Sequence, residues 1–479
     1  MVMRALPLLL LLLLPPQESS EKAMEKLYQF MDAGHYQEGR AIAESIARRF
    51  PRTKAAELAK PYTLDNAFLR IAPIEVNGPA SNRIDLSVMA DGLEYENKIQ
   101  ERWEKEADLI FKTFFASELF KEYAKYFNLY RIHVASKTSK LNKADGPVLT
   151  FFKSREDDGE ILTDGFTARD IAALTGANDR LAIVQVRPAG DSHGISGYGV
   201  AVVGSPRPTP AQILHAFGHA LAGLGDECTT HKGWYGMDRR KKEPPPIPTA
   251  PNISDTKDPA GVPWAHWLRA KKEGDKRAAK IDVIEGAALR PTKAWRPVDE
   301  NQCVMNDGQE YCPVCRETLL LLLYSFVRPI DDGMPFDKVI TVESGKSVDL
   351  WVLPLAPATH RLVVGWYVEK AGPGDKAGED AGGRKDETGI LTKVLRCPDG
   401  QVGPRNGEGP AWRAPRGDTF DGAAKKVGEA LRETLTLNNT RVAPGRYKVT
   451  AVARDLTEWV LKDSQNLLAD WRSWIVEIK

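Results

Sequence analysis

The pattern of hydrophobic and polar positions changes along the chain and divides it into segments of different structure. In residues 21–62, apolar residues recur at helical spacing in two stripes, with a break around Gly34. We predict a helical hairpin that resembles a single tetratricopeptide-like unit. One such unit cannot bury its own apolar face, so it must pack on another part of the chain. It serves either as an N-terminal cap or as a docking module for a partner.

From about residue 72 the pattern is mixed. Alternating or continuous apolar runs predict strands at 83–90, 130–135 and 180–186, and a long amphipathic helix is expected over 95–127. A further helix is expected to start after Pro208-Thr209-Pro210, and a leucine-rich helix covers 316–327. This order predicts an α+β domain with a mixed sheet over residues 72–332.

From residue 334 to residue 479 the apolar residues alternate with a period of two. The runs at 339–342, 347–352, 362–368, 434–437, 446–453 and 471–478 predict strands separated by turn-rich loops. The turn-to-strand step at residues 443–449 is typical of immunoglobulin-like sandwiches. We therefore expect an immunoglobulin-like β-sandwich, a type of domain that more often binds or spaces than catalyses.

Length and composition agree with this division. A chain of 479 residues exceeds one ordinary core, and 42% hydrophobic with 27% charged residues describes a globular protein. The net charge of +1 gives no electrostatic basis for binding nucleic acid or membrane lipid. We therefore expect neither of them as a partner.

The N-terminus has the pattern of an export signal. Arg4 precedes an apolar run over residues 5–14, and polar residues follow. This run is too short to span a bilayer and long enough for the core of a signal peptide, which we assign to residues 1–20. The protein is thus expected to be exported, either secreted or periplasmic, although an uncleaved N-terminal anchor remains an alternative. Export would permit disulfides among the five cysteines.

Residues 212–227 carry the candidate chemistry. His215 and His219 stand four positions apart on a predicted helix, so both imidazoles can reach one metal ion. The chain must turn after the helix, where glycines precede Asp226-Glu227, and this turn brings a carboxylate back toward the histidines. Zinc accepts two imidazoles and a carboxylate and keeps a fourth position open for water. In hydrolytic sites of this type a glutamate follows the first histidine, whereas Ala216 stands there in this chain.

The stretch resembles the metzincin-like metallopeptidases of the IgA-peptidase family, whose motif reads H-E-F-G-H-x-x-x-G-L-x-D-E. The segments 127–136, 197–202 and 303–317 are similar to that family as well, and the resemblance covers roughly residues 82–479. The motif residues that match are His215, Phe217, Gly218, His219, Gly223, Leu224, Asp226 and Glu227.

The resemblance implies one zinc ion per chain, held by His215, His219 and Asp226. Glu227 is the second choice for the third ligand, and His231 competes for the same role. The resemblance also places Met305 in the methionine turn beneath such a site. An ordinary core methionine is the alternative for that residue.

Ala216 is the departure that matters for activity, because alanine can neither accept a proton from zinc-bound water nor return one to a leaving amine. General acid–base help is typically worth about 10²–10⁴-fold in rate. Glu227 and Glu285 are the possible substitutes. We therefore expect an inactive or weakly active zinc metallopeptidase homologue, a pseudoenzyme that binds a peptide or protein in its cleft. The alternatives are an active zinc metallopeptidase with a relocated carboxylate base and a protein-binding scaffold without metal.

The cysteines leave two possibilities open. In an exported chain, Cys303 is expected to form a disulfide with Cys312 or Cys315. The alternative is a structural zinc on these three thiols, with Cys228 or Cys397 as the fourth ligand. A zinc ribbon normally has two C-x-x-C pairs, and this sequence has one, at Cys312 and Cys315.

Overall fold

The computed structural model describes residues 19–479 with internal gaps. Residues 1–18, which include most of the expected signal peptide, lie outside this part of the chain. No helix within the described part is long and apolar enough to cross a membrane. The internal ranges left out are 33–35, 64–69, 94–96, 135, 137–140, 143–149, 158–159, 176–180, 187–192, 195, 205–207, 230–246, 377–417, 421–422 and 428–429.

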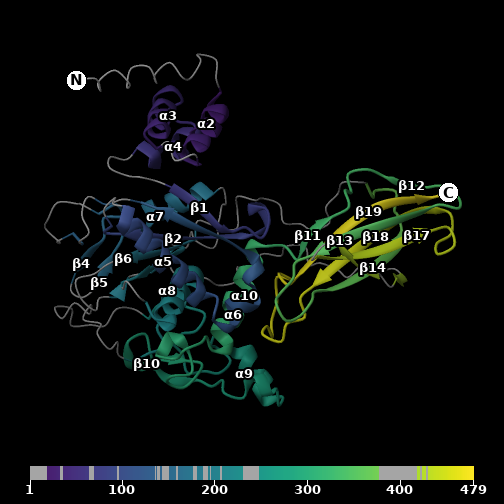
Figure 1. Cartoon of the computed structure of the whole chain (residues 1–479). Helices are drawn as coiled ribbons and strands as arrows, with labels where there is room; N and C mark the ends of the chain where they lie inside the picture. The colour runs from purple at the N-terminus through teal and green to yellow at the C-terminus, as the bar shows by residue number, and fades with distance from the viewer. Residues whose placement is uncertain are drawn as a thin grey trace, which may run out of the picture.

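The N-terminal segment is helical and packs on the body of the protein (Figure 1). It consists of α2 (Ser20–Asp32), α3 (Tyr36–Arg49) and the short α4 (Lys54–Ala59). Leu27 and Ile46 are fully buried, and they belong to the same hydrophobic cluster as Val184 of the central sheet. The apolar face that these helices could not bury alone is thus covered by the neighbouring sheet.

The central sheet has five strands in the order β1-β3-β2-β6-β8. The edge strand β1 is antiparallel to β3, while the other neighbouring strands pair in parallel. A separate small sheet has the order β4-β5-β7. The bounds of these strands are β1 (Arg70–Glu75), β2 (Ile84–Asp91), β3 (Phe127–His133), β4 (Arg155–Asp157), β5 (Glu160–Leu162), β6 (Leu181–Val186), β7 (His193–Gly194) and β8 (Val200–Val203).

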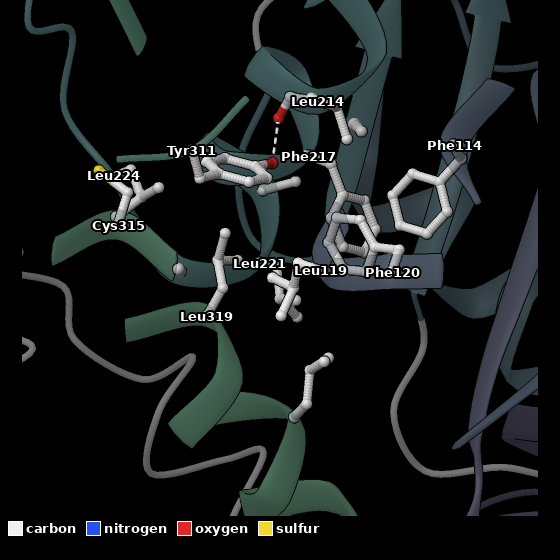
Figure 2. Packing of buried hydrophobic residues seen from close by; sticks show 14 of the residues in the cluster. Phe114, Leu119, Phe120, Leu214, Phe217, Leu221, Leu224, Tyr311, Cys315 and Leu319 are labelled. Atoms are coloured by element: carbon white, nitrogen blue, oxygen red, sulfur yellow. Dashed lines mark hydrogen bonds between the residues drawn. The ribbon is translucent and has the colours of Figure 1, made fainter. Parts of the chain in front are cut away.

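Both faces of the central sheet are covered, which explains its continuous apolar strands. Along β6, Leu181 and Ile183 face one hydrophobic cluster, and Ala182 and Val184 face another. The first cluster also takes in α5 (Asn97–Phe114), α6 (Glu118–Glu122), α8 (Pro210–Ala222) and α10 (Pro313–Phe326), part of which Figure 2 shows. The second takes in α7 (Gly165–Ala172) and the N-terminal helices.

The long helix predicted over 95–127 is interrupted. The chain leaves α5 after Phe114 and re-enters helix at Glu118, with Ser117 at the N-cap position of α6. The break lets the rings of Phe114 and Phe120 stack with their centroids 4.0 Å apart, and both rings pack against Phe217 of α8. No strong helix breaker stands at this point in the sequence. We therefore attribute the break to the aromatic packing.

The segment after α8 contains α9 (Ala265–Lys272) and the hairpin of β9 (Ile284–Ala287) with β10 (Arg290–Arg296). Beyond α10 the chain forms two sheets, β11-β13-β17-β16 and β12-β19-β18-β14-β15, which share one hydrophobic core containing the stacked Trp366 and Trp474. Together these parts make a mixed α+β protein. The bounds are β11 (Ile330–Gly333), β12 (Ile340–Val342), β13 (Ser347–Pro354), β14 (Val363–Lys370), β15 (Asp418–Phe420), β16 (Ala423–Val427), β17 (Ala430–Asn438), β18 (Gly445–Arg454) and β19 (Ala469–Ile478).

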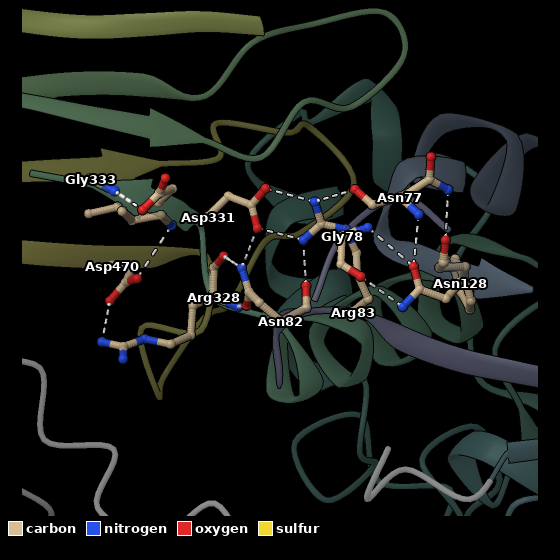
Figure 3. Close-up of polar contacts among 12 residues, drawn as sticks. Asn77, Gly78, Asn82, Arg83, Asn128, Arg328, Asp331, Gly333 and Asp470 are labelled. Atoms are coloured by element: carbon tan, nitrogen blue, oxygen red, sulfur yellow. Dashed lines mark hydrogen bonds and ion pairs between the residues drawn. The ribbon is translucent and has the colours of Figure 1, made fainter. Parts of the chain in front are cut away.

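A buried ion pair joins the C-terminal β-rich part to the central sheet. The guanidinium of Arg83, beside the start of β2, contacts both carboxylate oxygens of Asp331 in β11, with Nη2 to Oδ2 at 2.7 Å (Figure 3). The side chains of Arg83 and Asp331 are only 6% and 16% exposed. Asn82 donates to the same carboxylate at 3.0 Å and accepts from the backbone N–H of Arg328 at 2.6 Å. This network fixes the β-rich part against the central sheet.

We predict that Asp331→Ala destabilises the protein by about 3 kcal/mol, because it leaves the buried Arg83 guanidinium without its counter-charge. The matched control is Lys125→Ala, which breaks an exposed pair with Glu75 and should cost less than about 1 kcal/mol. Urea-induced unfolding of both variants and of the wild type measures the difference. Equal losses in the two variants would contradict the role given to the Arg83–Asp331 pair.

Candidate metal centre

The helix α8 begins and ends with strong local signals. Thr209 and Gln212 form a capping box in which each side chain accepts a backbone N–H of the other residue, and Pro210 occupies the first turn. The helix ends at Gly223, whose φ of +58° is a left-handed conformation that glycine adopts without strain. This turn directs the following residues back along the helix, toward His215 and His219.

The structure brings His215, His219 and Asp226 together. The Nε2 atoms of the two imidazoles are 2.9 Å apart, and Oδ1 of Asp226 lies 3.1 Å from His215 Nε2 and 3.4 Å from His219 Nε2. Between 20% and 25% of each side chain remains exposed. Three donor atoms thus lie close together, on side chains that remain partly exposed to solvent.

The other ring nitrogen of each histidine is held by a backbone carbonyl. His215 Nδ1 lies 3.1 Å from the oxygen of Val304, and His219 Nδ1 lies 2.6 Å from the oxygen of Leu224. A carbonyl oxygen can only accept, so each Nδ1 must carry the hydrogen. In the neutral rings the two Nε2 lone pairs then face each other and the Asp226 carboxylate. Such an arrangement calls for a cation at their centre.

The electrostatics of the metal-free site agree with that requirement. Burial disfavours a charged imidazole, but the neighbouring Asp226 carboxylate outweighs it and raises the pKa of His219. Burial likewise opposes a charged carboxylate, yet the two histidines hold the pKa of Asp226 well below its ordinary value. Asp226 Oδ1 is buried and makes no hydrogen bond. Without a metal, a proton on the histidines must supply the positive charge.

The candidate substitutes for the base lie outside this group. Ala216 itself is buried among apolar side chains beside Phe217. Glu227 is fully buried, and its carboxylate contacts Asn252 and cysteine thiols. Glu285 is exposed on β9, where it accepts the backbone N–H of Lys293 at 3.0 Å. Among the described residues, no histidine, cysteine or acidic side chain beyond His215, His219 and Asp226 joins the group. His231 lies outside the described residues.

Met305 lies beneath α8. It is fully buried, and its Sδ atom is so close to Gly218 that a Cβ atom there would stand 2.9 Å from the sulfur. The hydroxyl of Tyr311, a little further along the chain, donates to the backbone carbonyl of Leu214 on the same helix (Figure 2). The turn that carries Met305 is therefore packed tightly against the helix that carries the histidines.

The structure does not contain the predicted disulfide. Cys228, Cys303, Cys312 and Cys315 are free thiols, and Cys397 lies outside the described residues. The sulfurs of Cys303 and Cys315 are 3.7 Å apart, whereas a disulfide needs about 2.05 Å. Three of the thiols instead converge with the carboxylate of Glu227 in one buried group. The disulfide was predicted from the oxidising compartment of an exported protein alone. That prediction did not consider the carboxylate of Glu227 as a fourth member of the group.

Sequence reasoning assigned no role to Asn252, which organises the loop after α8. Its fully buried amide accepts the N–H of Gly225 at 2.8 Å and donates to the carbonyl of Gly225 and to Glu227 Oε1, both at 2.9 Å. The adjacent Asp226 is fixed as well, because its backbone oxygen accepts the N–H of Ala288 at 2.8 Å. No local spacing signals the role of Asn252, since its partners lie about 25 positions earlier.

The structure thus combines a mostly parallel sheet with a helix whose two histidines, together with one carboxylate, form a candidate metal-binding group. Residues 72–273 match the sequence model of the family described as IgA Peptidase M64. This match supports the metallopeptidase family that the resemblance of the motif implied. Among curated proteins, none shows a significant match to the chain.

We predict a pH-dependent contribution of the His219–Asp226 pair to the stability of the metal-free protein. The raised pKa of His219 adds stability that is complete below its ordinary value of 6.5 and is lost as pH rises through the raised value. The depressed pKa of Asp226 adds stability above its ordinary value of 3.8, and this is lost only as pH falls further. The advantage of the wild type over Asp226→Asn should therefore be largest between about pH 4 and 6.5.

Denaturant unfolding in the presence of a chelator at a series of pH values measures this advantage. As a control, Asp282→Asn removes a carboxylate that lies 3.0 Å from Lys271. Its effect should be constant from about pH 5 to 8, because lysine stays charged in that range. An equally constant effect of Asp226→Asn would refute the coupling of His219 to Asp226.

Proposed function

We propose that the chain is an exported metallopeptidase-family protein that binds zinc at His215, His219 and Asp226 and lacks the general base. It is inactive or weakly active on peptides, and the accessible side of the site binds a peptide or protein ligand. The observation that carries the proposal is the complete donor set beside Ala216, at the position where hydrolytic members of this class have glutamate.

The donor set fits zinc on chemical grounds. Two imidazoles and one carboxylate are the protein ligands of many catalytic zinc sites, which keep a further position open for water or substrate. The carbonyls of Val304 and Leu224 orient both rings so that Nε2 faces the metal position. The partial exposure of all three side chains supports an open fourth position.

Zinc in such a site polarises a carbonyl group and lowers the pKa of bound water. Hydrolysis also requires a residue that takes the proton from that water and delivers it to the leaving amine. The methyl group of Ala216 cannot do so, and the contacts of Glu227 and Glu285 hold their carboxylates elsewhere. His215, His219 and Asp226 would therefore hold a metal ion that polarises a peptide carbonyl, but neither Ala216 nor the two glutamates would carry the proton.

The finer architecture belongs to the same proposal. We assign residues 72–332 to a metzincin-like domain with Met305 in its methionine turn, and residues 334–479 to an immunoglobulin-like sandwich. Two packed sheets around Trp366 and Trp474 support the second assignment. Residues 21–62 form a helical cap. Export rests on the apolar run of residues 5–14 in the predicted signal peptide, residues 1–20.

We predict that Ala216→Glu raises the rate of peptide hydrolysis about 10²–10⁴-fold over the wild type, because it supplies the missing base. Hydrolysis across a peptide library, with purified zinc-loaded protein, measures the gain. Ala216→Gln is the matched control, since it has the same length but no carboxylate, and should give no gain. Adding His219→Ala to Ala216→Glu should abolish the gain.

Two outcomes would overturn the proposal in different ways. Metal-dependent turnover by the wild type that Ala216→Glu barely changes would identify an active peptidase with a relocated base. If the wild type and the His215→Ala/His219→Ala variant contain the same amount of zinc, no zinc binds at the histidines. The protein would then be a scaffold without metal at this site.

A further inference from the structure

A second group of side chains with possible metal-ligand atoms is buried in the structure. Cys303, Cys312, Cys315 and Glu227 offer ligand atoms that all lie within 4.8 Å of one another, and at most 2% of each residue is exposed. The residues come from three segments: the loop after α8, the turn before Met305 and the start of α10. None of these cysteines takes part in the function proposed above.

Three of the donor distances lie within about 0.5 Å of the edges of a tetrahedron around zinc. A Zn–S bond of about 2.3 Å places two sulfurs about 3.8 Å apart, and a sulfur and a carboxylate oxygen about 3.6 Å apart. The sulfurs of Cys303 and Cys315 are 3.7 Å apart. Oε1 of Glu227 lies 3.1 Å from the sulfur of Cys315 and 3.9 Å from that of Cys312.

The carboxylate of Glu227 is the independent sign that a cation belongs in the group. Oε1 accepts from Asn252, whereas the buried Oε2 has no hydrogen-bond partner. Glu227 forms no ion pair with a described side chain, and an unpaired buried carboxylate is strongly unfavourable. A disulfide between two of the cysteines would leave the third thiol and this carboxylate uncompensated.

We propose that Cys303, Cys312, Cys315 and Glu227 bind a structural zinc ion, separate from the one at the histidines. Four protein ligands close the coordination shell, as in structural zinc sites, and the burial of all four excludes substrate. Thiolates select zinc, copper(I) or iron–sulfur clusters, and the hard carboxylate oxygen favours zinc among them. Each thiol releases its proton to solvent when zinc binds.

The start of α10 suits thiolate ligands. Cys312 is the N-cap residue and Cys315 lies in the first turn, so both are close to the positive end of a 14-residue helix. The backbone N–H of Cys312 also donates to the sulfur of Cys303 at 3.4 Å. Cys228 is buried too, but it does not belong to the group, and Glu227 takes the place that the sequence suggested for Cys228 or Cys397.

The test uses the full chain carrying His215→Ala and His219→Ala, which removes the first site and leaves the cysteine group intact. We expect about one zinc per chain by elemental analysis, and X-ray absorption should show a sulfur shell at about 2.3 Å. Adding Cys312→Ser together with Cys315→Ser should remove the sulfur shell and the zinc. Cys228→Ala is the matched control, a buried free cysteine whose loss should change neither.

Measurements on the same double-histidine variant with all five cysteines intact keep the proposal testable if the serine variants do not fold. Bound zinc should protect Cys303, Cys312 and Cys315 from alkylation until a strong chelator is added. Zinc-free protein, zinc with only nitrogen and oxygen neighbours, or a disulfide from Cys303 to Cys312 or Cys315 would overturn the proposal. A sulfur-bound zinc here together with no zinc at the histidines would support it and refute only the proposed function.

Discussion

The backbone of Val304 and Met305 is the constraint on which both donor groups depend. The carbonyl of Val304 orients His215 at 3.1 Å, and the carbonyl of Met305 accepts the N–H of Glu227 at 2.8 Å. Two consecutive peptide groups thus connect α8 to the loop that follows it. Met305 packs so closely on Gly218 that the Cβ atom of any larger residue there would collide with the sulfur. This close packing holds the turn against α8. A zinc ion on Cys303 would anchor the same turn from its other side.

The parts predicted correctly from sequence are those that local chemistry decides. The start of α8 follows from its proline and capping signals, and the buried strands follow from their apolar runs. The break in the helix at Ser117 was missed because tertiary stacking of Phe114 and Phe120, with no strong local breaker, causes it. The group around Glu227 was also missed, since its carboxylate and Cys315 lie 88 positions apart and only the fold brings them together.

The C-terminal β-rich part is attached to the body through buried polar contacts. Asp455 accepts from Tyr123 and Tyr324 at 2.8 and 2.6 Å, and its other oxygen lies 2.8 Å from His360. Tyr324 belongs to α10, the same helix whose start carries Cys312 and Cys315. The end of α10 thus contacts the β-rich part through Tyr324, and its start carries two members of the cysteine group. A single helix therefore connects the two regions. The two sheets therefore brace the helix whose start carries Cys312 and Cys315.

In the proposed function, Ala216 separates metal binding from catalysis. The atoms that position the donor set are the carbonyls of Val304 and Leu224, the left-handed turn at Gly223 and the amide of Asn252. None of them involves the side chain at position 216. Alanine in place of glutamate there removes a proton carrier but leaves the positions of the donor atoms unchanged. The reverse exchange can restore the carrier to a donor set that is already in place. For this reason the single substitution Ala216→Glu distinguishes two cases. Activity returns if only the base is missing, and it does not return if the donor set itself is not functional.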